Sequence, residues 1–176
     1  MPLGYTQAGR KAMRWRSQVF APVGGICSTA ADCIRFLEFF LNPSGPLKPA
    51  IEKMLKPELG PGEGEVKALT WKQRPGEEWF WHNGVTGGFS AYIGFHPGRK
   101  RGIVLLTNRY AITLITELGQ RIQAVLMDET PPPMSGKYET AKAYAAQGLI
   151  EFVESPLWLR AGLAGLATGV CSWLMR

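Results

Sequence analysis

The sequence predicts an α+β fold in which an antiparallel sheet of about three to four strands carries helices packed against it. Between Glu78 and Asn108, segments with strand patterns follow one another and are joined by short turns rich in glycine and proline. Before and after this stretch, apolar residues recur at helical spacing. We therefore expect a sheet formed by the middle of the chain, with helices lying on it.

Three strands are expected in the middle of the chain, and a fourth precedes them at Val66–Trp71. The short segment Trp79–His82 is aromatic, and Phe89–Phe95 alternates its larger apolar side chains with the period of two that a strand requires. Ile103–Leu106 is a continuous apolar run, as expected for a strand covered on both faces. The predicted connections are Thr86-Gly87-Gly88 and Pro97–Gly102.

Three helices are expected outside these strands. Thr29 is a candidate N-cap of the first helix, because Asp32 three residues later completes a pattern like a capping box. The apolar stripe of this helix consists of Ala30, Cys33 or Ile34, Leu37, and Phe40 or Leu41. The other two helices are expected at Pro49–Leu55 and at Ile112–Met127, the second lying across one face of the sheet.

The triple proline Pro131–Pro133 divides the chain into residues 1–130 and a tail of residues 131–176. In the tail, Lys142–Trp158 has a helical pattern, and Ala161–Met175 is apolar over fifteen residues. A helix that crosses a bilayer needs about twenty apolar residues. We expect a packed or interfacial helix here, and the alternative is a short membrane anchor with weak membrane contact.

Length and composition are those of a globular protein, with 176 residues, 45% hydrophobic residues and a net charge of +6. The basic residues form no nucleic-acid-binding motif, so no nucleic-acid partner is expected. Three cysteines and two histidines show no metal-ligand spacing, so neither a metal nor another cofactor is expected. The amino terminus lacks the apolar core of a signal peptide, and the sequence leaves the localisation undetermined.

The run His82-Asn83-Gly84-Val85-Thr86 offers three interpretations. Asn83-Gly84 between apolar segments is a strong signal for a type I′ hairpin turn. A single histidine beside aromatic residues is more often a packed or hydrogen-bonded core residue than a catalytic one. The third interpretation is a functional strand, and it depends on a wider pattern of residues.

That wider pattern resembles the serine β-lactamases and penicillin-binding proteins. The run from His82 is similar to their third active-site box, a Lys-Thr-Gly on the strand that lines the acyl-enzyme cleft. The class C-like branch of the family, in which related esterases and D-alanyl peptidases often carry His-x-Gly, is similar in further motifs. These are Gly4-Tyr5, the run Pro22 to Asp32, Gly88-Phe89-x-x-Tyr92, Phe95-x-Pro97, Gly102-Ile103-Val104 and Thr107-Asn108.

The resemblance implies that residues 1–130 are the carboxy-terminal part of a transpeptidase-like domain. It also implies site roles: His82 matches the lysine, and the backbone N–H of Val85 matches the second oxyanion-hole donor, which makes these two the catalytic candidates. Asn83 matches the threonine that hydrogen-bonds substrate, and Gly84 permits close approach of substrate. Thr86 is a third substrate-binding candidate. Relatives often act in the periplasm or outside the cell.

Catalysis in this family also needs a Ser-x-x-Lys and a Tyr-x-Asn or Ser-x-Asn, because a serine hydroxyl must be activated by a neighbouring base. None of the serines is followed by lysine three residues later, and no tyrosine is followed by asparagine two residues later. We therefore expect hydrolysis of small-molecule or peptide acyl substrates by the complete enzyme and inactivity of these residues alone. The alternative is a non-catalytic binding or interaction module on the same scaffold.

Overall fold

The structure is a computed structural model, and it describes residues 2–15, 19, 21–56, 66–74 and 76–134. The expectations for Lys142–Trp158 and Ala161–Met175 lie outside the described residues, so they stay predictions. The domain boundary expected at residue 131 also stays a prediction. Among the described residues, no helix has the length and apolar character needed to cross a bilayer.

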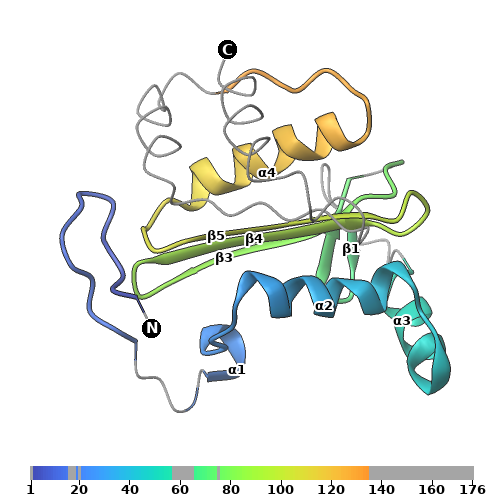
Figure 1. The fold of residues 1–176 in the computed structure, drawn as a ribbon, viewed down its shortest axis with the longest axis horizontal. Helices are drawn as coiled ribbons and strands as arrows, with labels where there is room; N and C mark the ends of the chain where they lie inside the picture. Colours follow the sequence, from blue (N-terminus) through green and yellow to red (C-terminus); the bar gives the residue numbers. More distant parts are fainter. Residues whose placement is uncertain (1, 16–18, 20, 57–65, 75, 135–176) are drawn as a thin grey trace.

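The described residues form three layers, with a sheet between two helical layers (Figure 1). The helix α2 (Ala30–Leu41) covers one face of the sheet, and α4 (Ile112–Leu126) covers the other. The smaller helical elements are α1 (Ala21–Gly24), the 3-10 turn η1 (Gly45–Leu47) and α3 (Lys48–Met54). The strands are β1 (Val66–Ala68), β2 (Trp71–Gln73), β3 (Phe80–Thr86), β4 (Phe89–His96) and β5 (Arg101–Thr107).

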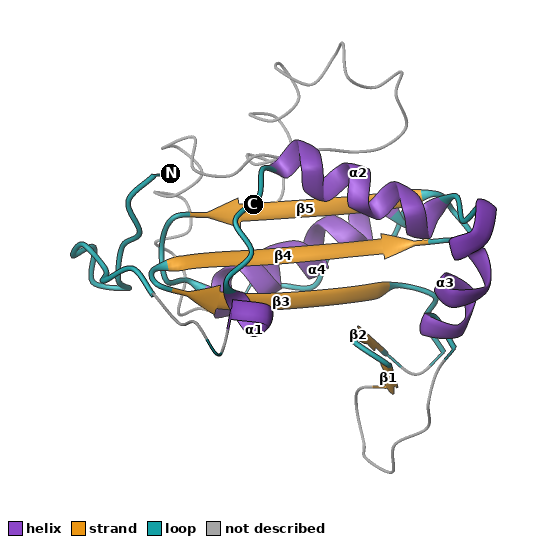
Figure 2. Cartoon of the chain, turned by 90° about the horizontal axis from the view of Figure 1, so that it is seen from below, coloured by secondary structure: helices purple, strands orange, loops and turns teal. Residues whose placement is uncertain are grey.

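The sheet is an antiparallel meander in the order β1-β2-β3-β4-β5. This confirms the α+β class, although the sheet has five strands where about three to four were expected. The difference arises at Val66–Trp71, where the single predicted strand is instead a hairpin of β1 and β2. Leu69 between them has a φ of +51°, in the left-handed region, and this reverses the chain direction. Both strands lie to one side of the three long strands (Figure 2).

The hairpin of β3 and β4 turns at Gly87-Gly88, which confirms the predicted connection Thr86-Gly87-Gly88 and excludes the alternative turn at Asn83-Gly84. The φ angles of Gly87 and Gly88 are +54° and +83°, and Thr86 pairs with Phe89 across them. Positive φ at both central residues is the requirement of a type I′ turn, which glycine meets at no steric cost. Asn83 and Gly84 do not turn the chain, because both are paired with β4. Four residue pairs, from Asn83 to Thr86 on β3, lie between His82 and the turn.

The core on the α2 face is aromatic. The ring of Phe95 lies 4.8 Å from Trp71, 5.1 Å from Phe40 and 5.6 Å from Phe80, measured between centroids. The cap predicted for α2 is present, because the backbone N–H of Asp32 donates to the Thr29 hydroxyl at 3.1 Å. The buried stripe of α2 matches the predicted one and consists of Ala30, Ile34, Leu37, Phe40 and Leu41.

The core on the α4 face is built around two tryptophans and a tyrosine. Trp81 stacks on Tyr92 at 5.7 Å, and the indole N–H of Trp79 donates to the Tyr92 hydroxyl at 3.4 Å. Burial is the main reason that the pKa of Tyr92 is raised well above its usual range. Helix α4 adds Ile115, Leu118, Ile122 and Leu126 to this core.

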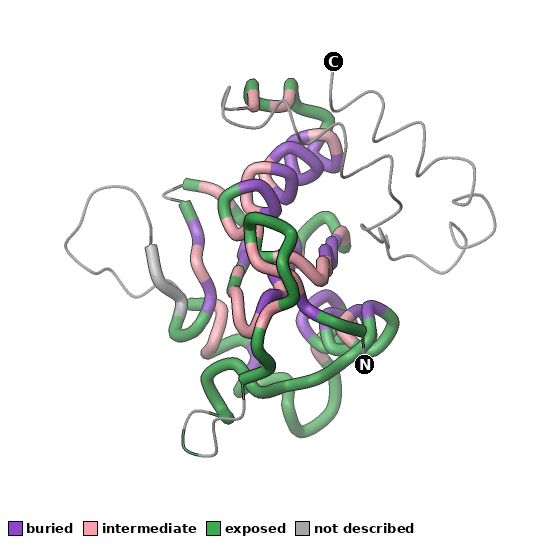
Figure 3. Tube along the Cα trace, turned by 90° about the vertical axis from the view of Figure 1, so that its left-hand side faces the viewer, coloured by how far each residue is buried: buried purple, intermediate pink, exposed green. Residues whose placement is uncertain are grey.

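The amino-terminal segment Pro2–Trp15 lies at the end of the sheet near the β3–β4 turn. Tyr5 joins it to the chain after β5, because its N–H donates to the carbonyl of Asn108 and its carbonyl accepts from Tyr110, both at 2.8 Å. Most of the segment is exposed (Figure 3), in contrast to the two cores. Further large apolar side chains are exposed between this segment and α2, at Val19, Val23 and Ile26.

Candidate functional site

Strand β3 has two parts with different neighbours. Phe80 and Trp81 are buried and pair with β4 on one side and with Gln73 and Lys72 of β2 on the other. From His82 to Thr86 the strand continues to pair with β4, and among the described residues nothing pairs with its other edge. We call residues 82–86 the open β3 edge. An unpaired edge presents backbone N–H and C=O groups that can bind an extended chain.

The open β3 edge divides its side chains between the two faces of the sheet, because successive residues of a strand point to opposite sides. His82, Gly84 and Thr86 share the α2 face with Phe80. His82 and Gly84 are exposed, and a methyl group added at Gly84 would meet no atom within 4 Å. The exposure of His82 excludes the alternative of a packed core histidine. Thr86 is half-buried on the same face, where a methyl group added at Gly24 of α1 would meet its side chain at 2.6 Å.

Asn83 and Val85 lie on the opposite face, toward α4. The Asn83 side-chain amide donates to the Thr116 hydroxyl of α4 at 2.7 Å, and that hydroxyl donates to the carbonyl of Ile112 at 2.6 Å. The structure thus separates the side chain of Asn83 from that of His82. Sequence reasoning missed Thr116, since a threonine inside a helix gives no signal that its hydroxyl meets a strand.

Val85 is a site candidate because of its backbone N–H. Its backbone position is fixed by pairing with the neighbouring strand β4. It pairs with Ser90, which is 2% exposed. The Ser90 hydroxyl donates to the carbonyl of Arg109 and accepts from the N–H of Ala111, both at 2.9 Å. These bonds tie the β3–β4 hairpin to the connection between β5 and α4, so the backbone at Val85 belongs to a braced part of the sheet.

The imidazole of His82 has a pKa below its ordinary value of 6.5. Partial burial of the ring on the sheet is the largest cause, the positive charge of Lys72 is the second, and a hydrogen bond with the backbone of Asn83 opposes both. His82 is therefore neutral at pH 7, with one ring nitrogen able to accept a proton or a hydrogen bond. The Lys72 ammonium lies 4.6 Å from the centroid of the Trp81 ring.

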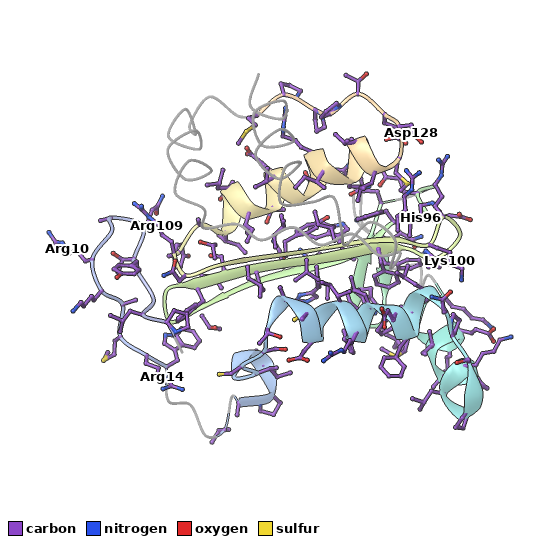
Figure 4. The ribbon with its side chains drawn as sticks, viewed as in Figure 1. Arg10, Arg14, His96, Lys100, Arg109 and Asp128 are labelled. Atoms are coloured by element: carbon purple, nitrogen blue, oxygen red, sulfur yellow. The ribbon has the colours of Figure 1, made fainter. Side chains whose placement is uncertain are left out.

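The second histidine, His96, is not part of this site. It ends β4 at the far end of the sheet, where its Nε2 lies 3.6 Å from a carboxylate oxygen of Glu78. Figure 4 shows His96 near Asp128, at the opposite end of the molecule from Arg10 and Arg109. The described residues contain no group of three side chains suited to hold a metal ion.

Comparisons with known proteins agree on the family. The sequence profile described as Beta-lactamase matches residues 2–118. Solved structures with a similar fold include the D-alanine carboxypeptidase AmpC from Burkholderia cenocepacia, with 26% identity, a TM-score of 0.54, and coverage of 61% of this chain and 41% of that protein. No curated protein matches.

A second solved structure, the beta-lactamase/D-alanine carboxypeptidase from Pseudomonas syringae, is 19% identical. Its TM-score is 0.59, and the match covers 74% of this chain and 45% of that protein. At this identity the likeness concerns the fold alone. The chain spans less than half the length of both solved relatives.

Proposed function

The chain belongs to the beta-lactamase family of serine hydrolases, and on that premise we propose that the open β3 edge forms one wall of an acyl-transfer cleft. The substrates proposed are amide or ester acyl compounds, namely β-lactams, D-alanyl peptides or esters. One observation carries the proposal: within the described part of the chain, β3 has no second strand neighbour from His82 onward, where the motif begins, and it presents an exposed imidazole there. A D-alanine carboxypeptidase among the solved relatives supports the substrate class.

The open β3 edge suits an acyl substrate in three ways. The edge can bind the substrate backbone as an added strand, and the exposed Gly84 leaves room for that approach. The N–H of Val85 is the proposed oxyanion donor, and the loss of such a donor costs about 3 kcal/mol of transition-state stabilisation in a complete enzyme. The neutral imidazole of His82 would accept a hydrogen bond or a proton from the reacting groups.

Residues 1–176 contain neither Ser-x-x-Lys nor Tyr-x-Asn, so we expect them not to form an acyl-enzyme by themselves. The test is hydrolysis of nitrocefin and of a p-nitrophenyl ester by the purified chain, with His82→Ala as the comparison. Rates equal to the uncatalysed background are expected for both proteins. Robust turnover that His82→Ala leaves unchanged would contradict the proposal.

Substrate binding can be tested without turnover. Titration of the ¹⁵N-labelled chain with N-acetyl-D-alanyl-D-alanine should shift the amide resonances of residues 82–86. Gly84→Val provides the control, because it places a side chain at an exposed position where an added Cβ would meet no atom within 4 Å in the unliganded protein. Shifts confined to other parts of the chain, or equal shifts in Gly84→Val, would contradict the proposed wall.

A second candidate function is a non-catalytic interaction module, and exposed apolar side chains favour it. Met13, Trp15, Val19, Val23 and Ile26 are between 65% and 87% exposed, although single exposed apolar residues are ordinary. A contact surface at these residues predicts a stable monomer or a defined complex in light scattering. Aggregation of the chain, unchanged when Trp15, Val23 and Ile26 are replaced by serine, would count against it.

A further inference from the structure

We propose that residues 10–15, with the sequence Arg-Lys-Ala-Met-Arg-Trp, are a docking surface for an anionic lipid bilayer. We call these residues the basic-apolar loop. The proposal goes beyond the acyl-transfer cleft, because the loop contains no residue of the open β3 edge. Either can fail without the other.

The backbone of the basic-apolar loop lies against the turn between β3 and β4. A methyl group added at Gly87 would meet the backbone nitrogen of Trp15 at 3.3 Å and the carbonyl oxygen of Met13 at 3.5 Å. The N–H of Ala12 donates to the carbonyl of Gly4 at 2.8 Å, which ties the loop to the start of the chain. Because its backbone contacts the turn, the loop presents its longer side chains to solvent at a defined end of the sheet.

The charges of the basic-apolar loop all have one sign. Arg10, Lys11 and Arg14 are exposed, and the ion pairs of the described residues include none of them. The first acidic residue of the chain is Asp32, which pairs with Arg35 at 2.9 Å. Figure 4 shows Arg10 and Arg14 pointing outward at this end of the molecule. Near an anionic bilayer each such charge strengthens binding about five-fold.

Apolar side chains stand between these charges. Met13 is 87% exposed and Trp15 is 65% exposed, and tryptophan favours the interface between a membrane and water. Charge and apolar insertion together are the two contributions that stable binding to a membrane surface needs. The aliphatic residues that follow, Val19, Val23 and Ile26, are also exposed. A nucleic acid offers such side chains no apolar partner, whereas a bilayer does, so the bilayer is the favoured partner.

The test is sedimentation of the purified full chain with vesicles of phosphatidylcholine that contain about one-third phosphatidylglycerol, compared with vesicles of phosphatidylcholine alone. Binding to the anionic vesicles should be stronger by at least about ten-fold, and it should weaken as salt is added. Replacing Arg10, Lys11 and Arg14 together by glutamine should weaken it roughly 100-fold, the effect of three charges.

The matched control removes the same charge from another end of the molecule. Lys48, Lys53 and Lys56 lie on and just after α3, and all three are exposed. Figure 1 shows α3 far from the amino-terminal segment. Replacing these three lysines by glutamine should change vesicle binding by no more than about three-fold, because salt screens distant charges.

Trp15 supplies a readout of insertion. Lipids with brominated acyl chains quench a tryptophan that enters the bilayer, and this quenching should be largely lost in Trp15→Phe. The buried Trp71, Trp79 and Trp81 are shielded by the fold. Undiminished quenching in Trp15→Phe would show that a tryptophan outside the basic-apolar loop enters the bilayer, and the proposal would be overturned.

Three further results would overturn the proposal: equal binding to the two kinds of vesicle, equal losses in the two triple variants, or binding of a single-stranded oligonucleotide by a chain that does not bind vesicles. The acyl-transfer cleft is judged separately by the amide shifts of residues 82–86 with N-acetyl-D-alanyl-D-alanine. A chain that shows those shifts and ignores anionic vesicles keeps the cleft and loses the docking surface.

Discussion

The two parts of β3 differ although they belong to one continuous strand. Phe80 and Trp81 are 6% and 4% exposed, with a strand on each side and a helix near each face. His82 and Gly84 are exposed and keep β4 as their one strand neighbour among the described residues. The buried part contributes packing, and the open part contributes accessible groups at a defined position.

This difference shows how a strand can be rigid and accessible together. The pairs from His82↔Ile93 to Thr86↔Phe89 continue the regular register of the buried part. The backbone of the open β3 edge is thus placed by the same hairpin that Phe80 anchors in the core. A site on such a strand is positioned more accurately than one on a loop.

The largest contrast is expected from truncation of one side chain in each part. Phe80→Ala removes a ring that stacks on Phe95 and should lower the free energy of unfolding by about 3–5 kcal/mol. His82→Ala removes an exposed ring and should change it by no more than about 0.5 kcal/mol. Urea unfolding of both variants, followed by fluorescence, measures the two values. Equal losses would remove the distinction between the parts.

Two glycines on β3 and β4 give the next contrast. A methyl group at Gly94, opposite Trp81, would lie 2.7 Å from the indole nitrogen of the buried Trp79, so Gly94→Ala should cost about 1–3 kcal/mol. Gly84→Ala would meet no neighbour and should be neutral or stabilising by up to about 1 kcal/mol. Thermal unfolding checks the signs. Destabilisation by Gly84→Ala comparable to that by Gly94→Ala would mean that the face at Gly84 is covered.

The hydrogen bond between Asn83 and Thr116 predicts a smaller effect. Asn83→Ala should cost about 0.5–1.5 kcal/mol, because it leaves the half-buried Thr116 without its strand partner. A double-mutant cycle with Thr116→Val should give a coupling energy of at least about 0.5 kcal/mol. Additive costs would show that α4 does not hold the open β3 edge through this bond.

The smallest effect concerns pH. Because the pKa of His82 in the folded chain is below 6.5, the unfolded chain takes up the proton first as the pH falls. The contribution of His82 to stability is therefore full above about pH 7 and is lost as the pH falls through the folded pKa. His82→Gln should show a weaker loss of stability than the unmodified chain between about pH 8 and about pH 5. Parallel pH profiles of the two proteins would contradict the lowered pKa.

The sequence predicted the architecture well where packing and periodicity agree. The stripe of α2, the cap at Thr29 and the alternation in β4 all appear in the structure. The turn predicted at Thr86-Gly87-Gly88 is present, and the sequence had left Asn83-Gly84 open as an alternative turn. The prediction failed between β1 and β2, because the apolar Leu69 gave no warning of the reversal there.

The role of the candidate site residues stays a proposal, and the structure bears on their placement alone. The sequence predicted a strand only to His82, whereas β3 runs to Thr86 and so places His82, Gly84 and Thr86 on one face. The bond from Asn83 to Thr116 joins residues 33 positions apart, and the position of Lys72 depends on the β2–β3 register. No local pattern encodes either contact, so both needed the tertiary structure.

Hydrogen exchange of the β3 amides is the most direct test of the open β3 edge. The amides of residues 82–86 that point away from β4 should exchange rapidly, while those that point toward β4 and those of Phe80 and Trp81 should be protected. This alternation beginning at His82 is the result expected. Uniform protection along all of β3 would show that its second edge is covered, and the proposed wall of an acyl-transfer cleft would then be lost.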